Sequence, residues 1–336
     1  MPSNVIDRAA SEMHLVDYRT SVQQLPTRNG FGEGLIEAGN RDANVLAICA
    51  DLAESTRMEG FKKAHPAQYL EIGVAEQMLV AMAGGLAAAG KIPWIASYAM
   101  FNPGRSWEQV RTIMALNETN VKIAGAHAGV SVGPDGATHQ AIEDIAIMRV
   151  IPKMFVVVPC DSVQTKKATL ALSATFGPTY LRFAREKSAI ITTEETPFEI
   201  GKAQIFREGN DVAIVACGIL VYNALLAADE LSREDGIECR VVNNHTVKPM
   251  DTAAVVDAAK HCGAVVTVEE HQTHAGMGSR VAEILVQHHP VPMEFIGVND
   301  RFGQSGDPVE LIEYYGMGST AIKEAVRRAY KRKGKT

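Results

Sequence analysis

Short apolar runs alternate along this chain with longer segments that have helical periodicity. In the first half we predict strands at 44–49, 121–126, 154–159 and 179–184, and helices at 77–90, 106–117 and 162–176. Near-continuous apolar strands separated by helices are typical of a parallel sheet that is buried on both faces. The pattern therefore predicts an α/β fold whose parallel sheet carries helices on both sides.

A second series of the same kind follows a polar, acidic segment that is interrupted by Pro197. Beyond this segment we expect strands at 211–218, 237–243, 264–270 and 292–298, and helices at 220–231, 251–259, 278–287 and 320–330. We therefore predict two domains: residues 20–190, with the larger sheet, and residues 211–331, a smaller α/β domain. Residues 191–210 are expected to be the linker.

Composition limits the classes of partner. The chain has 336 residues, of which 46% are hydrophobic and 21% charged, and this balance fits a globular protein with a sizeable core. A net charge of −6 argues against nucleic acid or an anionic membrane as the main partner. The start of the chain has no apolar signal core, and the apolar run 78–90 is too short to span a bilayer. Five scattered cysteines without a CxxC pair predict reduced thiols in the cytoplasm.

The segment 127–144, HAGVSVGPDGATHQAIED, combines several reactive side chains. His127, Asp135 and His139 lie within thirteen residues, and the glycines and the proline among them exclude a regular helix or strand. A helix is expected to begin after this loop, so the polar groups would gather at a helix N-terminus, where oxyanions and phosphates bind well. The alternative is an ordinary surface turn.

Two other segments place chemical groups at the ends of predicted elements. Glu76 follows a strand-like segment and stands in the first turn of an apolar helix, where a partly buried carboxylate can exchange a proton; the alternative is a helix-terminal charge. Tyr98 and Phe101 are three residues apart and would share one face of a helix, either to hold a planar ring or as core aromatics.

Arginines near element ends suggest an anion site. Arg28, Ser55 and Arg185 have this placement, and a guanidinium binds two phosphate oxygens at once, although each residue alone also fits a surface role. His271 and His274, expected in a loop after a strand, lack a third ligand and predict no metal site. No GxGxxG, Walker A or GxSxG sequence is present; the glycines at 30–34 precede a predicted helix with the wrong spacing.

Taken in order, these segments resemble the C-terminal half of transketolase. The most specific pieces are GVAEQ (73–77), SYAMF (97–101), the 127–144 loop and PCDSVQ (159–164), and the resemblance extends from Arg28 to the C-terminal helix. Transketolases bind thiamine diphosphate between a diphosphate-binding and a pyrimidine-binding domain. This chain resembles the pyrimidine-binding and C-terminal domains and lacks the GDG signature of the diphosphate-binding domain. The resemblance therefore implies one subunit of a split transketolase.

The resemblance also assigns roles around the cofactor. Glu76 matches the glutamate that bonds the pyrimidine ring and promotes loss of the thiazolium proton. Tyr98 and Phe101 match the aromatic pocket of that ring. Leu52 would support the bent cofactor, and Asp51 would lie at the subunit contact beside it.

The remaining roles concern the sugar. His127, Asp135 and His139 match residues that bind the hydroxyl and carbonyl groups of the donor, and both histidines could move protons. Arg28, Ser55 and Arg185 match the group that binds the sugar phosphate. The implied reaction moves a two-carbon ketol unit from a ketose phosphate to an aldose phosphate. The implied partner is an N-terminal subunit that holds Mg²⁺ or Ca²⁺, in a heterotetramer with two copies of each chain.

Several positions depart from the family pattern, and three alternatives stay open. Ala128, Pro134, Gln77 and Tyr98 replace residues that are common in transketolases, which leaves the donor and acceptor preference open and admits a specialised sugar phosphate. The alternatives are a β subunit of a 2-oxo acid dehydrogenase, a deoxyxylulose-phosphate synthase-like enzyme, which VVNNHTVKPMD and TVEEHQTHAGMGS resemble, and a non-catalytic scaffold. The DGATHQ loop and the set Arg28, Ser55 and Arg185 favour a sugar phosphate over a 2-oxo acid, and the joint presence of Glu76, His127, Asp135 and His139 argues against a scaffold.

Overall fold

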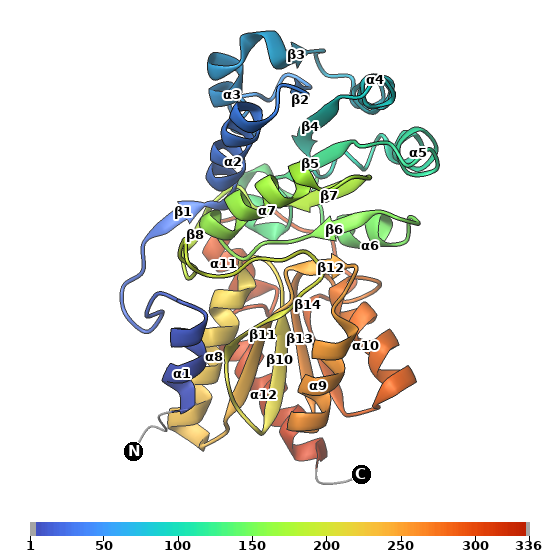
Figure 1. The fold of residues 1–336 in the computed structure, drawn as a ribbon. Helices are drawn as coiled ribbons and strands as arrows, with labels where there is room; N and C mark the ends of the chain where they lie inside the picture. The colour runs from blue at the N-terminus through green and yellow to red at the C-terminus, as the bar shows by residue number, and fades with distance from the viewer. Residues whose placement is uncertain (1–4, 334–336) are drawn as a thin grey trace.

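Six strands of the first half of the chain and one from the second half form a seven-stranded sheet in the computed structural model, which describes residues 5–333 (Figure 1). The strand order is β12-β6-β7-β5-β4-β2-β3, and every pair is parallel except β12 with β6. The strands are β2 (Val45–Cys49), β3 (Tyr69–Glu71), β4 (Ile92–Tyr98), β5 (Lys122–Ala126), β6 (Phe155–Val157), β7 (Thr179–Arg182) and β12 (Thr246–Lys248).

Helices cover both faces of this sheet, as the apolar pattern predicted. On one face, α2 (Thr27–Arg41) and α7 (Ser162–Ala174) pack together over Ala47 and Trp94; on the other, α4 (Glu76–Ala88) packs over Ile48 and Ile95. Successive strand residues face opposite sides, so both sets are buried. The first face also carries α3 (Glu59–Ala64), which packs against α2 at the sheet's margin. The second face also carries α5 (Trp107–Gln109), a π-helical turn (Val110–Ala115) and α6 (Asp144–Arg149).

The glycines at 30–34 lie inside α2, not before a helix as we expected. A Cβ at Gly30 would lie 1.8 Å from the carbonyl oxygen of Ser162, and one at Gly34 would lie 2.9 Å from that of Lys166. The glycines therefore allow α2 and α7 to approach closely, and this packing outweighs the helix-weakening effect of glycine.

The second sheet has five strands in the order β14-β13-β10-β11-β9, with only β9 antiparallel. The strands are β9 (Gln204–Arg207), β10 (Val212–Ala216), β11 (Cys239–Asn243), β13 (Val265–Gln272) and β14 (Met293–Val298). The helices are α8 (Leu220–Asp235), α9 (Thr252–Cys262), α10 (Met277–His288), α11 (Pro308–Tyr314) and α12 (Ser319–Lys333).

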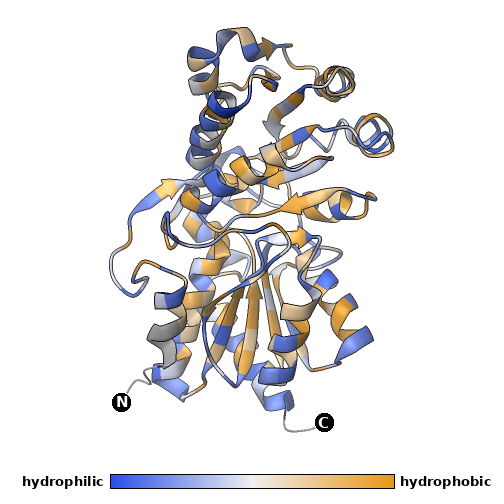
Figure 2. Cartoon of the chain, in the orientation of Figure 1, coloured by the Kyte–Doolittle hydropathy of each residue, from blue (hydrophilic) through white to orange (hydrophobic). Residues whose placement is uncertain are grey.

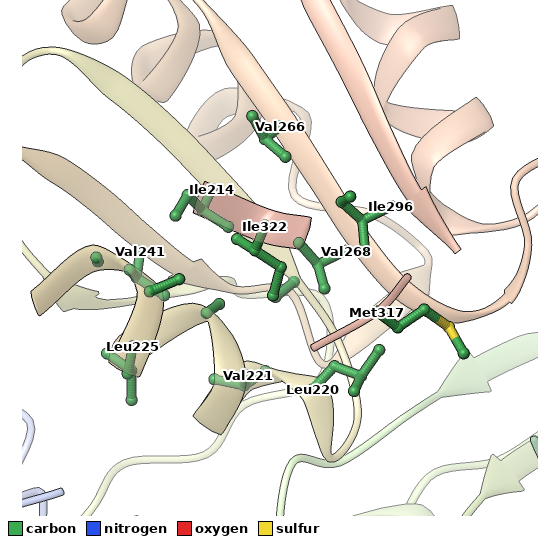
Figure 3. Close-up of a cluster of buried hydrophobic side chains, with 14 of the residues drawn as sticks. Ile214, Leu220, Val221, Leu225, Val241, Val266, Val268, Ile296, Met317 and Ile322 are labelled. Carbon is green, nitrogen blue, oxygen red and sulfur yellow. The ribbon is translucent and has the colours of Figure 1, made fainter. Parts of the chain in front are cut away.

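Its core is largely apolar, as Figure 2 shows by the mostly orange strands at the centre of this unit. Leu220 and Leu225 of α8 and Ile322 of α12 meet Ile214 and Val268 of the sheet (Figure 3). These findings confirm the predicted α/β class with a second, smaller unit.

The two halves interlock more than the sequence suggested. The segment 191–210, expected to be a linker, contributes β9 to the second sheet, and α1 (Val5–Glu12) contacts that strand. In return, β12 from the second half pairs with β6 of the first sheet. A two-stranded antiparallel sheet of β1 (Gln24–Pro26) and β8 (Lys187–Ala189) also joins distant segments. Such non-local pairs leave no periodic signal in a short segment.

Two further expectations were wrong. Strand β4 was missed, and Tyr98 is its last residue, so Tyr98 and Phe101 do not share a helix. His271 lies in β13 and is fully buried, not in a loop: its Nδ1 donates to the carbonyl of Gln272, and its Nε2 accepts from the N–H of Ala146 at 3.3 Å. Between residues 5 and 333, no helix is both long and apolar enough to cross a membrane.

Candidate functional site

The candidate residues of the first half gather at one edge of the seven-stranded sheet. At or just beyond the carboxyl ends of β2, β3, β4, β5 and β7 stand respectively Asp51, Glu76, Tyr98 with Phe101, His127, and Arg185. These strands run parallel, so their carboxyl ends meet at the same edge, where open α/β sheets bind ligands. The fold therefore assembles one site from segments that are far apart in the sequence.

Aromatic and imidazole rings form the centre of this edge. The rings of Tyr98 and His127 stack with centroids 4.0 Å apart, and Phe101 lies 6.2 Å from Tyr98 at an interplanar angle of 21°. His139 meets the edge of Phe101 at 5.3 Å, and its Nδ1 is 2.9 Å from the hydroxyl oxygen of Thr138. The loop 127–144 thus brings both histidines to the aromatic pair.

The charges of three arginines, Arg28, Arg57 and Arg185, act on His127. The Nη1 of Arg28, at the start of α2, donates to the carbonyl oxygen of Ser55 at 2.9 Å, and Arg185 pairs with Asp135 at 3.3 Å. Burial, followed by the charges of Arg57 and Arg185, lowers the pKa of Arg28. Mutual repulsion of this kind requires the guanidinium groups to be close together. The site is therefore prepared for an anion.

His127 is neutral in this setting. Its side chain is 1% exposed, and its buried Nδ1 has no hydrogen-bond partner within residues 5–333. Burial lowers the pKa of His127 to about 3, and Arg28, Arg185 and Arg57 act in the same direction. A neutral imidazole with an unsatisfied buried nitrogen is suited to hydrogen-bond a polar ligand.

Glu76 stands in the first turn of α4, which follows β3 at the end of the sheet. The residue is 5% exposed, and its carboxylate makes no hydrogen bond or ion pair with the part of the chain that the structure describes. Its flanking residues Val74 and Met78 are 75% and 56% exposed. A largely buried glutamate without a partner in the described part of the chain, beside open apolar surface, indicates that another molecule completes this side of the site.

Glu71 holds the two neighbouring turns together. Its Oε1 accepts the N–H groups of Asp51 at 2.8 Å and Gly73 at 3.1 Å, and its Oε2 accepts the hydroxyl of Tyr69 at 2.6 Å. Desolvation opposes its charge, but these donors keep the pKa of Glu71 below its usual value. Glu71 therefore fixes the turn that precedes Glu76.

Backbone strain marks the same edge. Asp51, Arg57 and His127 have positive φ angles of 61°, 66° and 56°, a region that residues other than glycine rarely adopt. Strained residues of this kind are concentrated at functional sites, because only a tightly determined structure retains them.

Sequence reasoning missed Arg57 and Glu71. Arg57 lies beside Arg28 and donates from Nε to Asn29 at 3.0 Å. The signal that could have found it was Gly32 in α2: a Cβ there would lie 2.8 Å from the Cβ of Arg57, so this glycine allows Arg57 to approach the helix. No sequence signal pointed to Glu71, because it is the last residue of a short strand and the sequence alone does not distinguish it from an ordinary exposed strand residue.

The remaining candidates lie nearby with less direct roles. Leu52 is half-buried against the core under α2, and Asp51 is exposed, with its backbone held by Glu71. Ser55 contributes its carbonyl oxygen to Arg28.

The donor set fits the pyrimidine part of thiamine diphosphate. Tyr98 and Phe101 offer aromatic faces to a planar ring, and the unpartnered carboxylate of Glu76 can bond a ring nitrogen. Within residues 5–333, no cluster of three or more histidine, cysteine or acidic side chains could hold a metal ion.

The lowered pKa of His127 makes a prediction about acid stability. The unfolded chain takes up a proton at His127 below pH 6.5, whereas the folded chain does so only near pH 3, so this residue's stabilising contribution is present above pH 6.5 and is lost as the pH falls. Between pH 7.5 and 5 we expect His127 to remove about 2 kcal/mol from the free energy of unfolding. Urea titrations of wild type and His127→Gln should show a shallower pH dependence in the variant.

His288 provides the control, because it is exposed in the last turn of α10. His288→Gln should keep the wild-type slope. Equal slopes for wild type and His127→Gln would contradict the buried neutral imidazole.

Comparisons with known proteins match the two halves separately. The family model "Transketolase, pyrimidine binding domain" matches residues 23–189, and "Transketolase, C-terminal domain" matches residues 201–322. A 6-deoxy-6-sulfo-D-fructose transketolase subunit from Clostridium sp. is 40% identical over 91% of this chain and 95% of its own length. One of the subunits of an apulose-4-phosphate transketolase, from Phocaeicola vulgatus, is 37% identical over 88% of this chain and 94% of its own length.

A solved structure is similar over nearly the same span. It is described as "split gene transketolase, inactive beta4 tetramer", and it superposes with a TM-score of 0.86 at 41% identity, covering 92% of this chain and 99% of that one.

Proposed function

This chain belongs to the transketolase family as a subunit of the split-gene type, and we propose that it transfers a two-carbon ketol unit between sugar phosphates together with a separate diphosphate-binding subunit. One observation carries the proposal: a buried, unpartnered Glu76, an aromatic pair and a cluster of arginines converge on one edge of the sheet. A scaffold would gain nothing from this costly arrangement.

Thiamine diphosphate is the cofactor that we propose, in line with the family. Glu76 would bond its pyrimidine ring, Tyr98 and Phe101 would flank that ring, and Asp51 and Leu52 would line the neighbouring turn. The bound cofactor supplies the carbanion chemistry. This chain's part is to orient the ring and to hold a proton at the Glu76 carboxylate.

The opposite side of the site would hold the sugar. Arg28, Arg57 and Arg185 would bind the anionic end of the substrate, and His127, His139 and Asp135 would bind the hydroxyl and carbonyl groups near the reacting carbon. Fixing the far end in this way orients the reacting end. The two curated relatives are named for sugars with a sulfo or a phosphate group, which supports an anionic substrate.

The partner would supply what this chain lacks. We propose an N-terminal subunit that binds the diphosphate and its Mg²⁺ or Ca²⁺, in a heterotetramer with two copies of each chain. The description of the solved relative as an inactive tetramer of one chain type supports the need for that subunit. The five free, buried cysteines suit a reducing compartment such as the cytoplasm.

Calorimetry with thiamine diphosphate and Mg²⁺ tests this proposal. We expect the cofactor to bind at least ~100-fold more tightly once a GDG-containing partner is added, because each chain carries half of the site. Ketol transfer should appear only in the same mixture. Tight binding to this chain alone would overturn the shared site.

A further inference from the structure

Strand β13 of the second sheet ends directly beneath the substrate loop of the first unit. Glu270, near the end of this strand, is 4% exposed, and its Oε1 accepts the N–H of Ser131 at 2.6 Å. A Cβ built at Gly129 would lie only 2.2 Å from the Cδ of Glu270, and Gly129 has a φ of +89°. The carboxylate therefore fills the space immediately below the residues that follow His127.

The neighbouring glutamate serves a different element. Glu269 accepts the N–H groups of Met277 at 2.7 Å and Gly278 at 2.8 Å, at the start of α10. Successive strand residues face opposite sides of a sheet, so only Glu270 of this pair faces the loop. Glu269 is accordingly a matched control: it is a buried glutamate on the same strand, bonded to two backbone amides elsewhere.

A buried charge network ties the same strand to the first sheet. The Nη2 of Arg182, from β7, donates to the carbonyl oxygen of Glu270 at 2.8 Å, and its Nε donates to Asp144 at 2.7 Å. Burial raises the pKa of the Glu270 carboxyl, while Arg182 and the Ser131 N–H oppose that rise. The guanidinium thus bonds one carboxylate, Asp144, and the backbone of Glu270, while its charge also acts on the Glu270 carboxyl. Burying three charged side chains is costly to keep for stability alone.

We propose that Glu270 is a positioning residue of the C-terminal unit: by holding the backbone at Gly129 and Ser131, it sets the His127 ring in the orientation that binds the donor sugar. This inference rests on the proposed function, since it gives the loop a sugar to bind. It also gives the second unit a defined task at a site formed by the first, over a separation of 139 residues between Ser131 and Glu270.

Comparison of Glu270→Ala with Glu270→Gln separates the effect of the hydrogen-bond acceptor from the effect of the side chain's volume. Alanine removes the acceptor of the Ser131 N–H and opens space under the loop, whereas glutamine keeps an oxygen in the same place. In the complex with the partner subunit we expect Glu270→Ala to raise the KM of the donor sugar phosphate roughly 10-fold, with the KM of thiamine diphosphate within about twofold of wild type. Glu270→Gln should recover most of the donor KM.

Hydrogen exchange gives a readout that does not depend on activity. Amides of residues 127–135 should exchange faster in Glu270→Ala than in wild type, and this change should be absent in Glu269→Ala, which loosens the start of α10 instead. If Glu270→Ala does not fold, Glu270→Asp replaces it, because aspartate keeps the charge and withdraws the acceptor from Ser131.

The outcomes are distinguishable. A wild-type complex without ketol transfer would refute the proposed function. Amide exchange in residues 127–135 would still show whether Glu270 holds this loop in place. An active complex in which loss of the Glu270 acceptor changes neither the donor KM nor loop exchange would overturn the inference. If the donor KM rises equally in Glu269→Ala, the effect of Glu270 is one of general stability. That result would overturn the inference as well.

Discussion

Replacing Glu76 by glutamine should lower kcat of the assembled enzyme by about 10²–10⁴-fold, because a carboxamide cannot hold the proton that we assign to this carboxylate. Glu76 is 5% exposed and has no hydrogen-bond or ion-pair partner between residues 5 and 333, so its charge has no structural use within this chain. Glutamine is nearly isosteric, and the fold and assembly should therefore survive. Steady-state kinetics with the partner subunit measure the effect, and light scattering checks the assembly.

Glu59 offers a matched control for Glu76. It also lies in the first turn of a helix, α3, but it is solvent-exposed and pairs with Lys63 at 2.7 Å. Glu59→Gln should leave kcat within about twofold, because an exposed ion pair contributes little. If the Glu76→Gln complex has wild-type kcat, Glu76 does not transfer a proton in the reaction. A non-catalytic scaffold would then again explain this chain.

The sheet strands that could be predicted are those buried on both faces. Strands β2 and β10 are continuous apolar runs, and β5 after its first residue and the first half of β13 are mainly apolar, so these strands can be recognised without a tertiary partner. Strand β4 escaped because Pro93 interrupts its start and its last residues resemble an aromatic helix face. The short strand β12 depends on β6 from the first half of the sequence, and β9 depends on β11 further along the second half, so no local pattern predicts either strand.

The same distinction applies to the candidate site. His127, Asp135 and His139 could be predicted because they share one loop with unusual turn residues, which is a local signal. Glu71 and Glu270 could not be predicted, because each acquires its partner only when distant segments meet: Glu71 with Asp51, and Glu270 with Ser131. Sequence thus indicates groups that carry chemistry, whereas the groups that position them are defined by the fold.

Loss of Asp144 should be the most destabilising single change in the first unit, and we expect Asp144→Ala to lower the free energy of unfolding by about 3–5 kcal/mol. The Asp144 carboxylate accepts both the Tyr180 hydroxyl and Arg182 Nε at 2.7 Å, deep in the interior. Although burial disfavours the charge of Arg182, Asp144 and then Glu270 hold its pKa above the usual value. Alanine would leave this guanidinium buried and short of its main counter-charge.

Tryptophan fluorescence during urea unfolding can measure this loss, because both tryptophans, Trp94 and Trp107, lie in the unit that contains Asp144. Glu118→Ala is the control: its ion pair with Lys153 is exposed, so it should cost about 0–1 kcal/mol.

The double variant Asp144→Ala, Arg182→Met separates the two possible origins of this cost. If an unpaired buried charge is the cause, removing the guanidinium as well should restore part of the stability lost in Asp144→Ala. If packing is the cause, the second substitution should add to the loss. Asp144→Ala that costs no more than Glu118→Ala would refute the network as a source of stability. Arg182 also donates to the carbonyl oxygen of Glu270. We therefore expect Asp144→Ala to raise the donor KM as well, which would link the stability of this network to substrate binding.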